Sequence, residues 1–519
     1  MASIDSGLGA AQAGDTASHP TKLDGPLLKV AAAVIAGSIM AILDTTVVTI
    51  ALQSLIVEFH TSFDTVQWVT TAYMLALAAV IPVTGWAADR FGTKRLYALA
   101  LTLFLVGSVL AGFAWNIGSM IAFRVLQGLG GGILTPAGMT VLAKAAGPAR
   151  VGRVMSLLGV PMLLGPLAGP IVGGWLVDSG GWRWIFYLNV PIGLLALALT
   201  LRYLPKDTET TGGALDTVGT LLLSPGVALV LYGVSGIPRS GGITPGVWLP
   251  VALGLLMIAG FVVRAQRIEH PLLDLSLFRN RRFSLAVVTM ALFAVAFFGV
   301  SILLPTEFLM VRQLSALETG MQLLPLGIGA VVTMPLSGRL ADRVGPGKVV
   351  VPGLLLIAAG ITVFTQAGPD SGYATVLAPG LFVIGLGVGA TMMPIISAAL
   401  QVLDGPAVAR GSTMANIIQQ GFGAIGSAVM SIVLAAGLAG RFDVPVSQGQ
   451  LVATTALADP ARHATALGMV SDTFTTTFVW SLALVILCLV PACFLWRKPA
   501  EAVSAPVPRL KAGTVDGLS

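Results

Sequence analysis

Residues 85–95 read GWAADRFGTKR, and residues 338–348 read GRLADRVGPGK. Both segments place an aspartate four positions after a glycine, followed by an arginine, a second glycine and a final basic residue. Each segment directly follows a long apolar stretch. The repeat therefore predicts that the chain consists of two related halves, an arrangement typical of proteins that move solutes along a path between the halves.

Composition indicates the medium in which these halves fold. The chain has 519 residues, of which 55% are hydrophobic and only 10% are charged. Soluble proteins carry roughly 25% charged residues because their surfaces must be hydrated. This composition excludes a cytosolic enzyme, a nucleic-acid-binding protein and a disulfide-stapled secreted domain. It predicts an all-α polytopic membrane protein.

Hydropathy predicts fourteen membrane-spanning helices, because about 20 apolar residues are needed to cross the hydrocarbon core. The apolar windows lie at 28–54, 66–87, 96–114, 117–142, 154–177, 183–204, 215–236, 246–264, 284–309, 318–338, 348–366, 374–401, 411–438 and 474–496.

The basic residues predict the orientation of these spans. With both termini cytoplasmic, 23 of the 29 lysine and arginine residues fall in inward segments, five fall in outward segments, and Arg124 lies within a span. This bias is the one that the positive-inside rule demands. One miscounted span would invert every later loop and remove the bias. The sequence thus predicts cytoplasmic tails at 1–27 and 497–519.

The spacing of the repeat predicts the domain organisation. The two copies are separated by more residues than six spans with short loops require, and two of the apolar windows fill the excess. We expect a six-helix bundle over 28–204, a two-helix insert with cytoplasmic linkers over 205–283, and a second six-helix bundle over 284–496. The segment 441–473 is expected to be an extracytoplasmic loop, either a lid or a passive connector.

The energy source is inferred from the kinds of motif that the chain contains. The glycine-rich segment 127–132 (QGLGGG) lacks the lysine and the Ser/Thr that a phosphate-binding loop requires. The only cysteines are Cys488 and Cys493, so neither a disulfide framework nor a metal site is indicated. We expect no cofactor and no metal, and an ion gradient, acting on charges inside the membrane, as the driving force.

Three charged residues are predicted to lie within spans, namely Asp44, Arg124 and Glu307. An ionised side chain at the centre of a span costs about 2.5–3.5 kcal/mol, so each one calls for a reason. For Asp44 and Arg124 we expect a proton relay facing a wet cavity, in which a changed pairing binds or releases a proton. The alternative is a fixed ion pair that only locks two helices. Glu307 lies near the outer end of its span, where a relay and simple solvation at the interface are both open.

The fifth window carries a regular pattern of glycines. Gly165, Gly169 and Gly173 recur every four residues and share one helix face, which permits close approach of a neighbouring helix. The interspersed prolines remove backbone donors and favour bending. The pattern predicts a hinge or a sliding surface, with ordinary small-residue packing as the alternative. The predicted set is Gly159, Pro161, Gly165, Pro166, Gly169, Pro170, Gly173 and Gly174.

A substrate cavity is predicted from polar and adaptable apolar side chains within the spans. The polar residues of the thirteenth window form one broad face, which lines a cavity or bonds to a neighbouring helix. Phenylalanines of the ninth window and methionines of the twelfth suit an adaptable apolar pocket, with packing as the alternative. The predicted cavity residues are Gln127, Phe293, Phe297, Thr306, Met392, Asn416 and Gln420.

Taken in order along the chain, these motifs resemble the major facilitator superfamily, specifically its fourteen-span drug:proton antiporter branch. Segment 43–48 looks like the acidic motif of the first span, and 124–128 is similar to a fourth-span motif linked to proton transfer. Segment 159–174 resembles the fifth-span antiporter motif, and 181–193 looks like a segment typical of the branch. One departure is Thr306-Glu307, where the branch commonly has an aromatic residue and a glutamine; the extra acid would suit a cation-recognising variant.

The resemblance also implies a role for the repeated loop motif. In this family the loop between the second and third spans forms a charged latch that controls the inward gate. The implied latch residues are Gly85, Asp89, Arg90, Gly92 and Arg95, together with Asp342 and Arg343 of the second copy.

By this resemblance the chain is expected to be a proton-coupled exporter of amphipathic compounds, cationic ones included, in the bacterial plasma membrane. An exporter of an endogenous lipid, metabolite or antibiotic would share every motif. A channel is disfavoured by the paired latch motifs, and an enzyme by the lack of clustered catalytic residues within the spans. The expected partners are small molecules and membrane lipid, without nucleic acid. A periplasmic or outer-envelope adaptor and the oligomeric state are left open.

Overall fold

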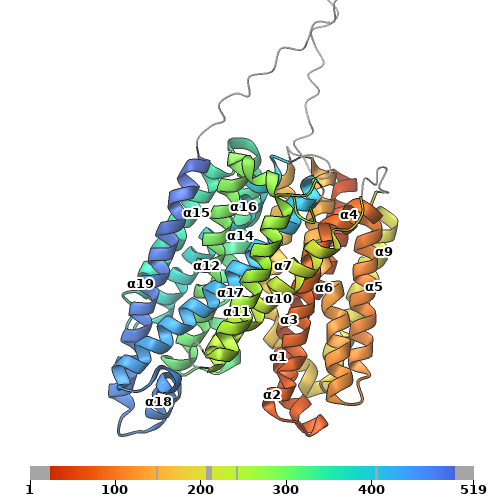
Figure 1. Ribbon diagram of the computed structural model, residues 1–519. Helices are drawn as coiled ribbons and strands as arrows, with labels where there is room; N and C mark the ends of the chain where they lie inside the picture. Colours follow the sequence, from red (N-terminus) through yellow and green to blue (C-terminus); the bar gives the residue numbers. More distant parts are fainter. Residues whose placement is uncertain are drawn as a thin grey trace, which may run out of the picture.

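The computed structural model describes residues 24–496 except 148–149, 206–212, 241–243, 270 and 404–406. In this part of the chain every regular element is a helix, and the long helices run side by side as a bundle (Figure 1). The predicted all-α membrane fold is thereby confirmed. Most of the predicted N-terminal tail and all of the C-terminal tail lie outside the described residues.

The N-terminal half follows the predicted windows, and two of them, 66–87 and 183–204, are divided into shorter helices. In the window 66–87, Pro82 lies in a 3-10 turn at Ile81–Val83 that separates α3 from α4. Proline lacks the backbone N–H that a continuous helix would use there. The helices of this half are α1 (Gly25–Phe59), α2 (Phe63–Val66), α3 (Trp68–Val80), α4 (Thr84–Phe91), α5 (Thr93–Gly112), α6 (Ile117–Ala146), α7 (Val151–Gly180), α8 (Arg183–Tyr187) and α9 (Asn189–Tyr203).

The insert and the C-terminal half continue the same all-helical pattern. The insert consists of α10 (Thr217–Ser240) and α11 (Pro245–Ala265), followed by a 3-10 helix at Leu275–Arg279. The C-terminal half contains α12 (Arg281–Met310), α13 (Ala316–Gln322), α14 (Leu324–Val344), α15 (Gly347–Phe364), a π-helix at Tyr373–Leu377, α16 (Ala378–Leu400), α17 (Ala407–Phe442), α18 (Val446–Ala458) and α19 (His463–Leu495).

Thirteen helices within the described residues are long and apolar enough to cross a bilayer. A further helix, α7, is 30 residues long and covers the remaining window, 154–177, although several of its side chains lie outside the described set. Helix therefore covers each of the fourteen predicted windows, and the chain is an integral membrane protein.

The segment 441–473 differs from the expected loop. It contains α18, which packs against α17 and α19, and α19 already begins at His463 rather than at residue 474. The sequence concealed this because α18, with 13 residues, is too short to cross the membrane, although its residues are compatible with helix. The segment is a short helical hairpin at the end of the bundle where α2 also lies (Figure 1).

The insert joins the two halves on one side of the molecule. Helix α10 packs against α3 of the N-terminal half and against α17 of the C-terminal half. The rings of Trp68 and Tyr232 stack with centroids 6.0 Å apart at this contact. Within the insert, Asp216 forms a 2.9 Å ion pair with Arg264 and its side chain is only 2% exposed. Asp216, just before α10, is therefore a buried charge that is compensated by a partner on the adjacent helix α11.

Candidate functional site

A buried ionic cluster connects α1, α6 and α9. Asp44 Oδ2 lies 2.6 Å from Arg124 Nη1, and neither side chain is exposed. Asp44 Oδ1 accepts hydrogen bonds from Gln127 Nε2 at 2.8 Å and from Asn189 Nδ2 at 3.0 Å. Buried charges are expensive unless they are paired and hydrogen-bonded. The acid and the arginine predicted from the sequence thus lie together, with two amide side chains completing the shell of the carboxylate.

The guanidinium of Arg124 is held from three further directions. It donates to the Val69 carbonyl through Nε at 3.2 Å and to Gln127 Oε1 through Nη1 at 2.6 Å. Its carbon Cζ lies 4.1 Å from the centroid of the Tyr73 ring, within cation–π range. Arg124 Nη2 and the Tyr73 hydroxyl are buried, and among the described residues they have no hydrogen-bond partner. These two polar groups give the cluster unused hydrogen-bonding capacity.

Glycines of α6 bring this cluster together. A Cβ at Gly128 would lie 2.5 Å from the Tyr73 carbonyl, and one at Gly132 would collide with the Leu77 carbonyl. Only residues without a side chain let α6 approach α3 this closely. The glycine-rich segment 127–132 is therefore a helix-packing surface. It places Arg124, one turn before Gly128, beside the backbone of α3.

A cavity of about 240 Å³ lies next to the ionic cluster and is lined by both halves of the chain. Thr45 and Tyr73 contribute polar atoms from the N-terminal half, and Asn416, Gln419 and Gln420 contribute them from α17. Because the Tyr73 ring contacts the Arg124 guanidinium and also lines the cavity, it links the two.

The predicted cavity residues fall into three groups. Asn416 and Gln420 line the cavity. Phe293, Phe297 and Met392 line a smaller adjoining hollow, which shares Phe298 and Gln419 with the cavity.

Gln127 and Thr306 lie elsewhere and line neither of these two spaces. Gln127 is fully buried in the ionic cluster, and the Thr306 hydroxyl donates to the Ile302 carbonyl at 2.7 Å. Their contacts are with the protein itself, so as direct contributors to a substrate cavity they have no support from this geometry.

The glycine face of α7 packs on the helix that carries Asp44. A Cβ at Gly165 would collide with Ile42, and one at Gly169 would collide with Thr46. One at Gly173 would come within 3.0 Å of Val47. The predicted close helix approach is confirmed at these three positions.

The other positions of the antiporter motif behave differently. Gly159 faces Met334 of α14, whereas a Cβ added at Gly174 would meet no heavy atom within 4 Å. The side chains of Pro161, Pro166 and Pro170 lie outside the described residues. The tight contact with α1 is thus limited to the middle of the motif.

Replacing Gly169 by valine should obstruct this contact. The added side chain must displace Thr46 or separate α7 from α1, at a cost of about 1–3 kcal/mol for an overpacked interface. We expect a lower thermal unfolding midpoint and reduced transport. Gly174→Val is the matched control, because the space at Gly174 is open. Equal effects of the two substitutions on unfolding and on transport would contradict the proposed contact.

The first copy of the latch motif contacts α17. Asp89 Oδ2 lies 3.3 Å from Arg410 Nε, and Arg410 Nη1 lies 3.7 Å from Asp274 Oδ2. The Asp89 side chain is 4% exposed. A Cβ at Gly85 would lie 3.1 Å from Thr413 Oγ1, so α4 and α17 are in direct contact. The two halves are tied together at this end of the bundle (Figure 1).

The second copy makes the corresponding contact with α7. Asp342 accepts hydrogen bonds from the backbone N–H groups of Gly152 at 2.8 Å and Arg153 at 3.1 Å. These groups belong to the first turn of α7, where unpaired N–H groups and the helix dipole favour an anion. A third contact between the halves joins Thr140 Oγ1 and Ser412 Oγ at 2.5 Å. The three contacts close the α4 end of the molecule.

The remaining latch residues have conformational or surface positions. Gly92 and Gly345 adopt φ angles of 87° and 93°, which glycine accepts without strain. Arg90, Arg95 and Arg343 are exposed at this end of the bundle. The two aspartates of the motif thus make the contacts between the halves.

Glu307 is buried rather than solvated. Its side chain is 6% exposed, and Oε1 lies 3.2 Å from Arg312 Nε. The guanidinium of Arg312 also donates to the carbonyls of Gly368, Pro369 and Ser371. Of the two alternatives for Glu307, simple solvation does not fit this burial, and a proton relay stays a prediction. The pair ties the outer end of α12 to the connection between α15 and α16, and Glu307 is not among the residues lining the cavity.

Several residues at these sites were assigned no individual role from the sequence, among them Tyr73, Asn189 and Arg410. An aromatic residue within a span is ordinarily packed in the core, so Tyr73 carried no distinguishing signal. Asn189 lies within the segment 181–193, which was singled out only by resemblance, and Arg410 is one of many inward basic residues. The partner of Asn189 is Asp44, 145 residues away in sequence, and the partner of Arg410 is Asp89, 321 residues away.

Two halves that meet through paired contacts at one end and enclose a cavity further in are the architecture of a membrane transport protein rather than of an enzyme. The chain belongs to the major facilitator superfamily, whose family model matches residues 34–428.

Relatives extend the match over most of the chain. The chain is 42% identical over 508 residues to the multidrug resistance protein B homolog of Mycobacterium tuberculosis, with 94% of each chain covered. It is 32% identical over 408 residues to the tetracenomycin C resistance and export protein of Streptomyces glaucescens, covering 78% of this chain and 75% of that one. It is 33% identical over 405 residues to a puromycin resistance protein of Streptomyces alboniger, with coverages of 77% and 80%.

Solved structures agree with the fold. The human organic anion transporter MFSD10 matches with a TM-score of 0.58 at 16% identity, covering 89% of this chain and 100% of that one. The proton:xylose symporter XylE matches with a TM-score of 0.54 at 16% identity, covering 88% and 94%. At this level of identity the likeness concerns the fold alone.

Proposed function

We propose that this protein exports amphipathic compounds, cationic ones included, in exchange for protons, as a member of the fourteen-span drug:proton antiporter branch. Two relatives named as resistance proteins and one named as a resistance and export protein support the drug-efflux part of the proposal. The observation that carries the coupling part is the buried Asp44–Arg124 pair, one side chain away from a cavity lined by both halves. The proton gradient is the proposed energy source, without a cofactor.

Coupling follows from the chemistry of the ionic cluster. A proton on Asp44 neutralises the carboxylate and leaves the Arg124 charge uncompensated in a buried site, which is costly. The lowest-cost response is a rearrangement that gives the guanidinium other partners or water. Such a rearrangement moves α1, which lies against the glycine face of α7, and shifts Tyr73 at the cavity wall. Protonation and cavity shape are thereby linked in both directions.

Alternating access requires the halves to separate at the α4 end. The contacts of Asp89 with Arg410, Asp342 with the first turn of α7, and Thr140 with Ser412 would have to break for the cavity to open there. Each is a polar contact that water can replace. The latch and proton-coupling residues named from the sequence remain predictions in these roles.

The proposed location is the bacterial plasma membrane, with the α4 end and both termini in the cytoplasm. The excess of basic residues in the loops at the α4 end supports this orientation. Substrates and membrane lipid are the proposed partners, and a periplasmic or outer-envelope adaptor remains a prediction from the resemblance.

Transport in everted vesicles tests the proposal. Vesicles containing the protein should accumulate cationic and neutral amphipathic compounds when acidified inside, and an uncoupler should abolish the accumulation. Accumulation that an uncoupler does not change would contradict proton coupling. Accumulation of lipid-like compounds alone would replace drug export by lipid export as the function.

Tyr73 provides a test of the link between the cavity and the ionic cluster. Tyr73→Phe keeps the ring over Arg124 and removes only the hydroxyl without a hydrogen-bond partner, so we expect nearly normal efflux. Tyr73→Leu removes a desolvated cation–π contact worth about 2 kcal/mol, and we expect efflux to fall at least about tenfold. Efflux rates per inserted protein are compared in vesicles. Equal rates in the two variants would contradict the role of the ring.

A further inference from the structure

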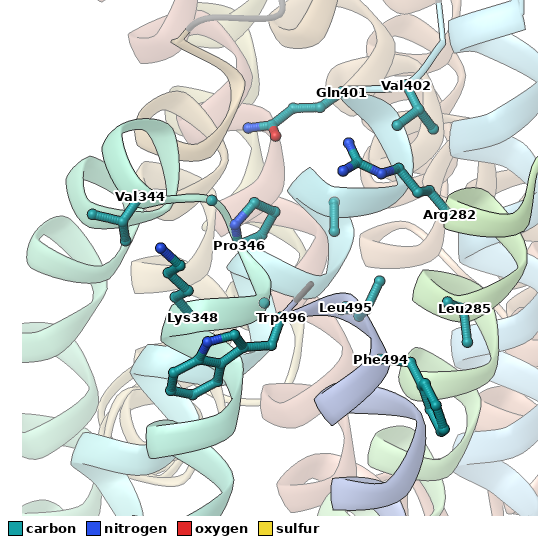
Figure 2. Close-up of a pocket in the computed structure, with 13 residues that line it drawn as sticks. Arg282, Leu285, Val344, Pro346, Lys348, Gln401, Val402, Phe494, Leu495 and Trp496 are labelled. Atoms are coloured by element: carbon teal, nitrogen blue, oxygen red, sulfur yellow. The ribbon is translucent and has the colours of Figure 1, made fainter. Parts of the chain in front are cut away.

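A second pocket, of about 270 Å³, lies at the α4 end of the C-terminal half (Figure 2). It is formed by the first turns of α12 and α15 and by the last turns of α14, α16 and α19. None of its lining residues comes from the N-terminal half, so it is separate from the cavity and from the contacts that close the gate.

Two cations lie on opposite sides of this pocket. Arg282 approaches from α12, and Lys348 approaches from the first turn of α15, with Gln401 between them at the upper edge (Figure 2). No acidic side chain is among the lining residues, and within the described part of the chain neither cation forms an ion pair. The pocket is thus chemically suited to an anion.

The two copies of the repeat differ at this point. In the first copy, Lys94 Nζ donates to the carbonyls of Leu201 and Leu204 at 2.8 Å each, at the end of α9. The aligned residue of the second copy is Gly347, whose backbone lies directly against the Leu495 carbonyl at the end of α19. A glycine therefore makes the helix-end contact in the second half. The charge of Lys348, the next residue, remains available to the pocket.

The surroundings of the pocket are those of a membrane surface. Phe494 and Trp496 line it, and each is 46% exposed at the end of an apolar helix. Tryptophan is enriched at the level of lipid headgroups. Further along α19, Ile486, Leu487 and Val490 are each at least 50% exposed, which provides a surface for an acyl chain.

We propose that this pocket binds the phosphate of an anionic phospholipid headgroup from the leaflet at the α4 end, with the acyl chains along α19. Basic pockets between transmembrane helices on the cytoplasmic side suit such headgroups, and this leaflet carries the anionic lipid. The proposal concerns a lipid held by the C-terminal half and does not depend on the transported substrate or on proton coupling.

Native mass spectrometry of the purified full-length protein, titrated with phosphatidylglycerol, tests the site. Arg282→Gln with Lys348→Gln should weaken binding of the most tightly held lipid about 25-fold, since each basic residue at a membrane surface contributes about fivefold. The matched control is Arg279→Gln with Arg281→Gln, which removes two exposed charges nearby that do not line the pocket. We expect the control to bind like the wild type. Phosphatidylcholine should bind more weakly than phosphatidylglycerol to the wild type.

Three results would overturn the proposal. Equal weakening in both double variants would mean that surface charge alone attracts the lipid. Unchanged binding in the pocket variant would place the lipid elsewhere. Displacement of phosphatidylglycerol by millimolar inorganic phosphate would make free phosphate the ligand. If the pocket variant does not fold, Gln401→Glu places a negative charge at the pocket edge and should also weaken phosphatidylglycerol binding, and an unaltered affinity there would equally refute the site.

Discussion

Replacing Asp44 by asparagine should reduce proton-driven efflux to the level of vesicles that lack the protein. Asparagine has nearly the shape of aspartate but cannot take up a proton or balance the charge of Arg124. The carboxylate accepts bonds from Arg124, Gln127 and Asn189, so no other acid within the described residues can take its place in the cluster. The measurement is substrate accumulation driven by an imposed pH gradient, normalised to the amount of inserted protein.

Stability must be separated from coupling in this experiment. Breaking a buried ion pair by removing one partner costs about 3–5 kcal/mol, because the other charge is left uncompensated. Asp44→Asn with Arg124→Gln removes both charges and should restore much of the stability without restoring efflux. Asp216→Asn is the matched control, since it also breaks a buried ion pair but lies in the insert. Wild-type efflux in Asp44→Asn, or equal loss in Asp216→Asn, would contradict a proton-carrying role for Asp44.

The fold was largely predictable because the bilayer imposes a simple rule on sequence. A span must be long, apolar and helical, so windows of hydropathy identify helices even without knowledge of their neighbours. The same rule explains the errors. It merged α3 and α4 across Pro82, because a 3-10 break does not change mean hydropathy. It assigned the residues of α18 to a loop, because a helix of 13 residues is too short for a span.

The site was predictable only in part, for a different physical reason. Asp44 and Arg124 were conspicuous because a charge inside a span is costly, whereas Tyr73 and Asn189 are ordinary residues until their neighbours are known. Asp216 and Glu307 show the converse. Their burial depends on Arg264 and Arg312, partners that hydropathy cannot pair with them. The sequence pattern shows which charged residues are costly to bury, and only the tertiary contacts show which partners compensate them.

A disulfide between positions 140 and 412 should lock the protein with its α4 end closed. Thr140 Oγ1 on α6 and Ser412 Oγ on α17 are 2.5 Å apart, close to the roughly 2.05 Å of a sulfur–sulfur bond. Thr140→Cys with Ser412→Cys is introduced into a chain in which Cys488 and Cys493 are replaced by alanine. Oxidation is expected to reduce efflux to background, and a reductant is expected to restore it.

Reversibility makes this experiment decisive between a moving gate and a rigid scaffold. Because the same molecules are measured before and after reduction, a recovered rate shows that the cross-link blocked a movement and did not damage the fold. Gly437→Cys with Thr473→Cys is the matched control, since a Cβ at Gly437 on α17 would lie 4.0 Å from Thr473 Cβ on α19, within disulfide range and inside one half. A protein that conducts solute without separating its halves would transport equally well with the 140–412 bond fully formed. That result would remove the basis for alternating access through the α4 end, because the bond directly joins the two surfaces that must part.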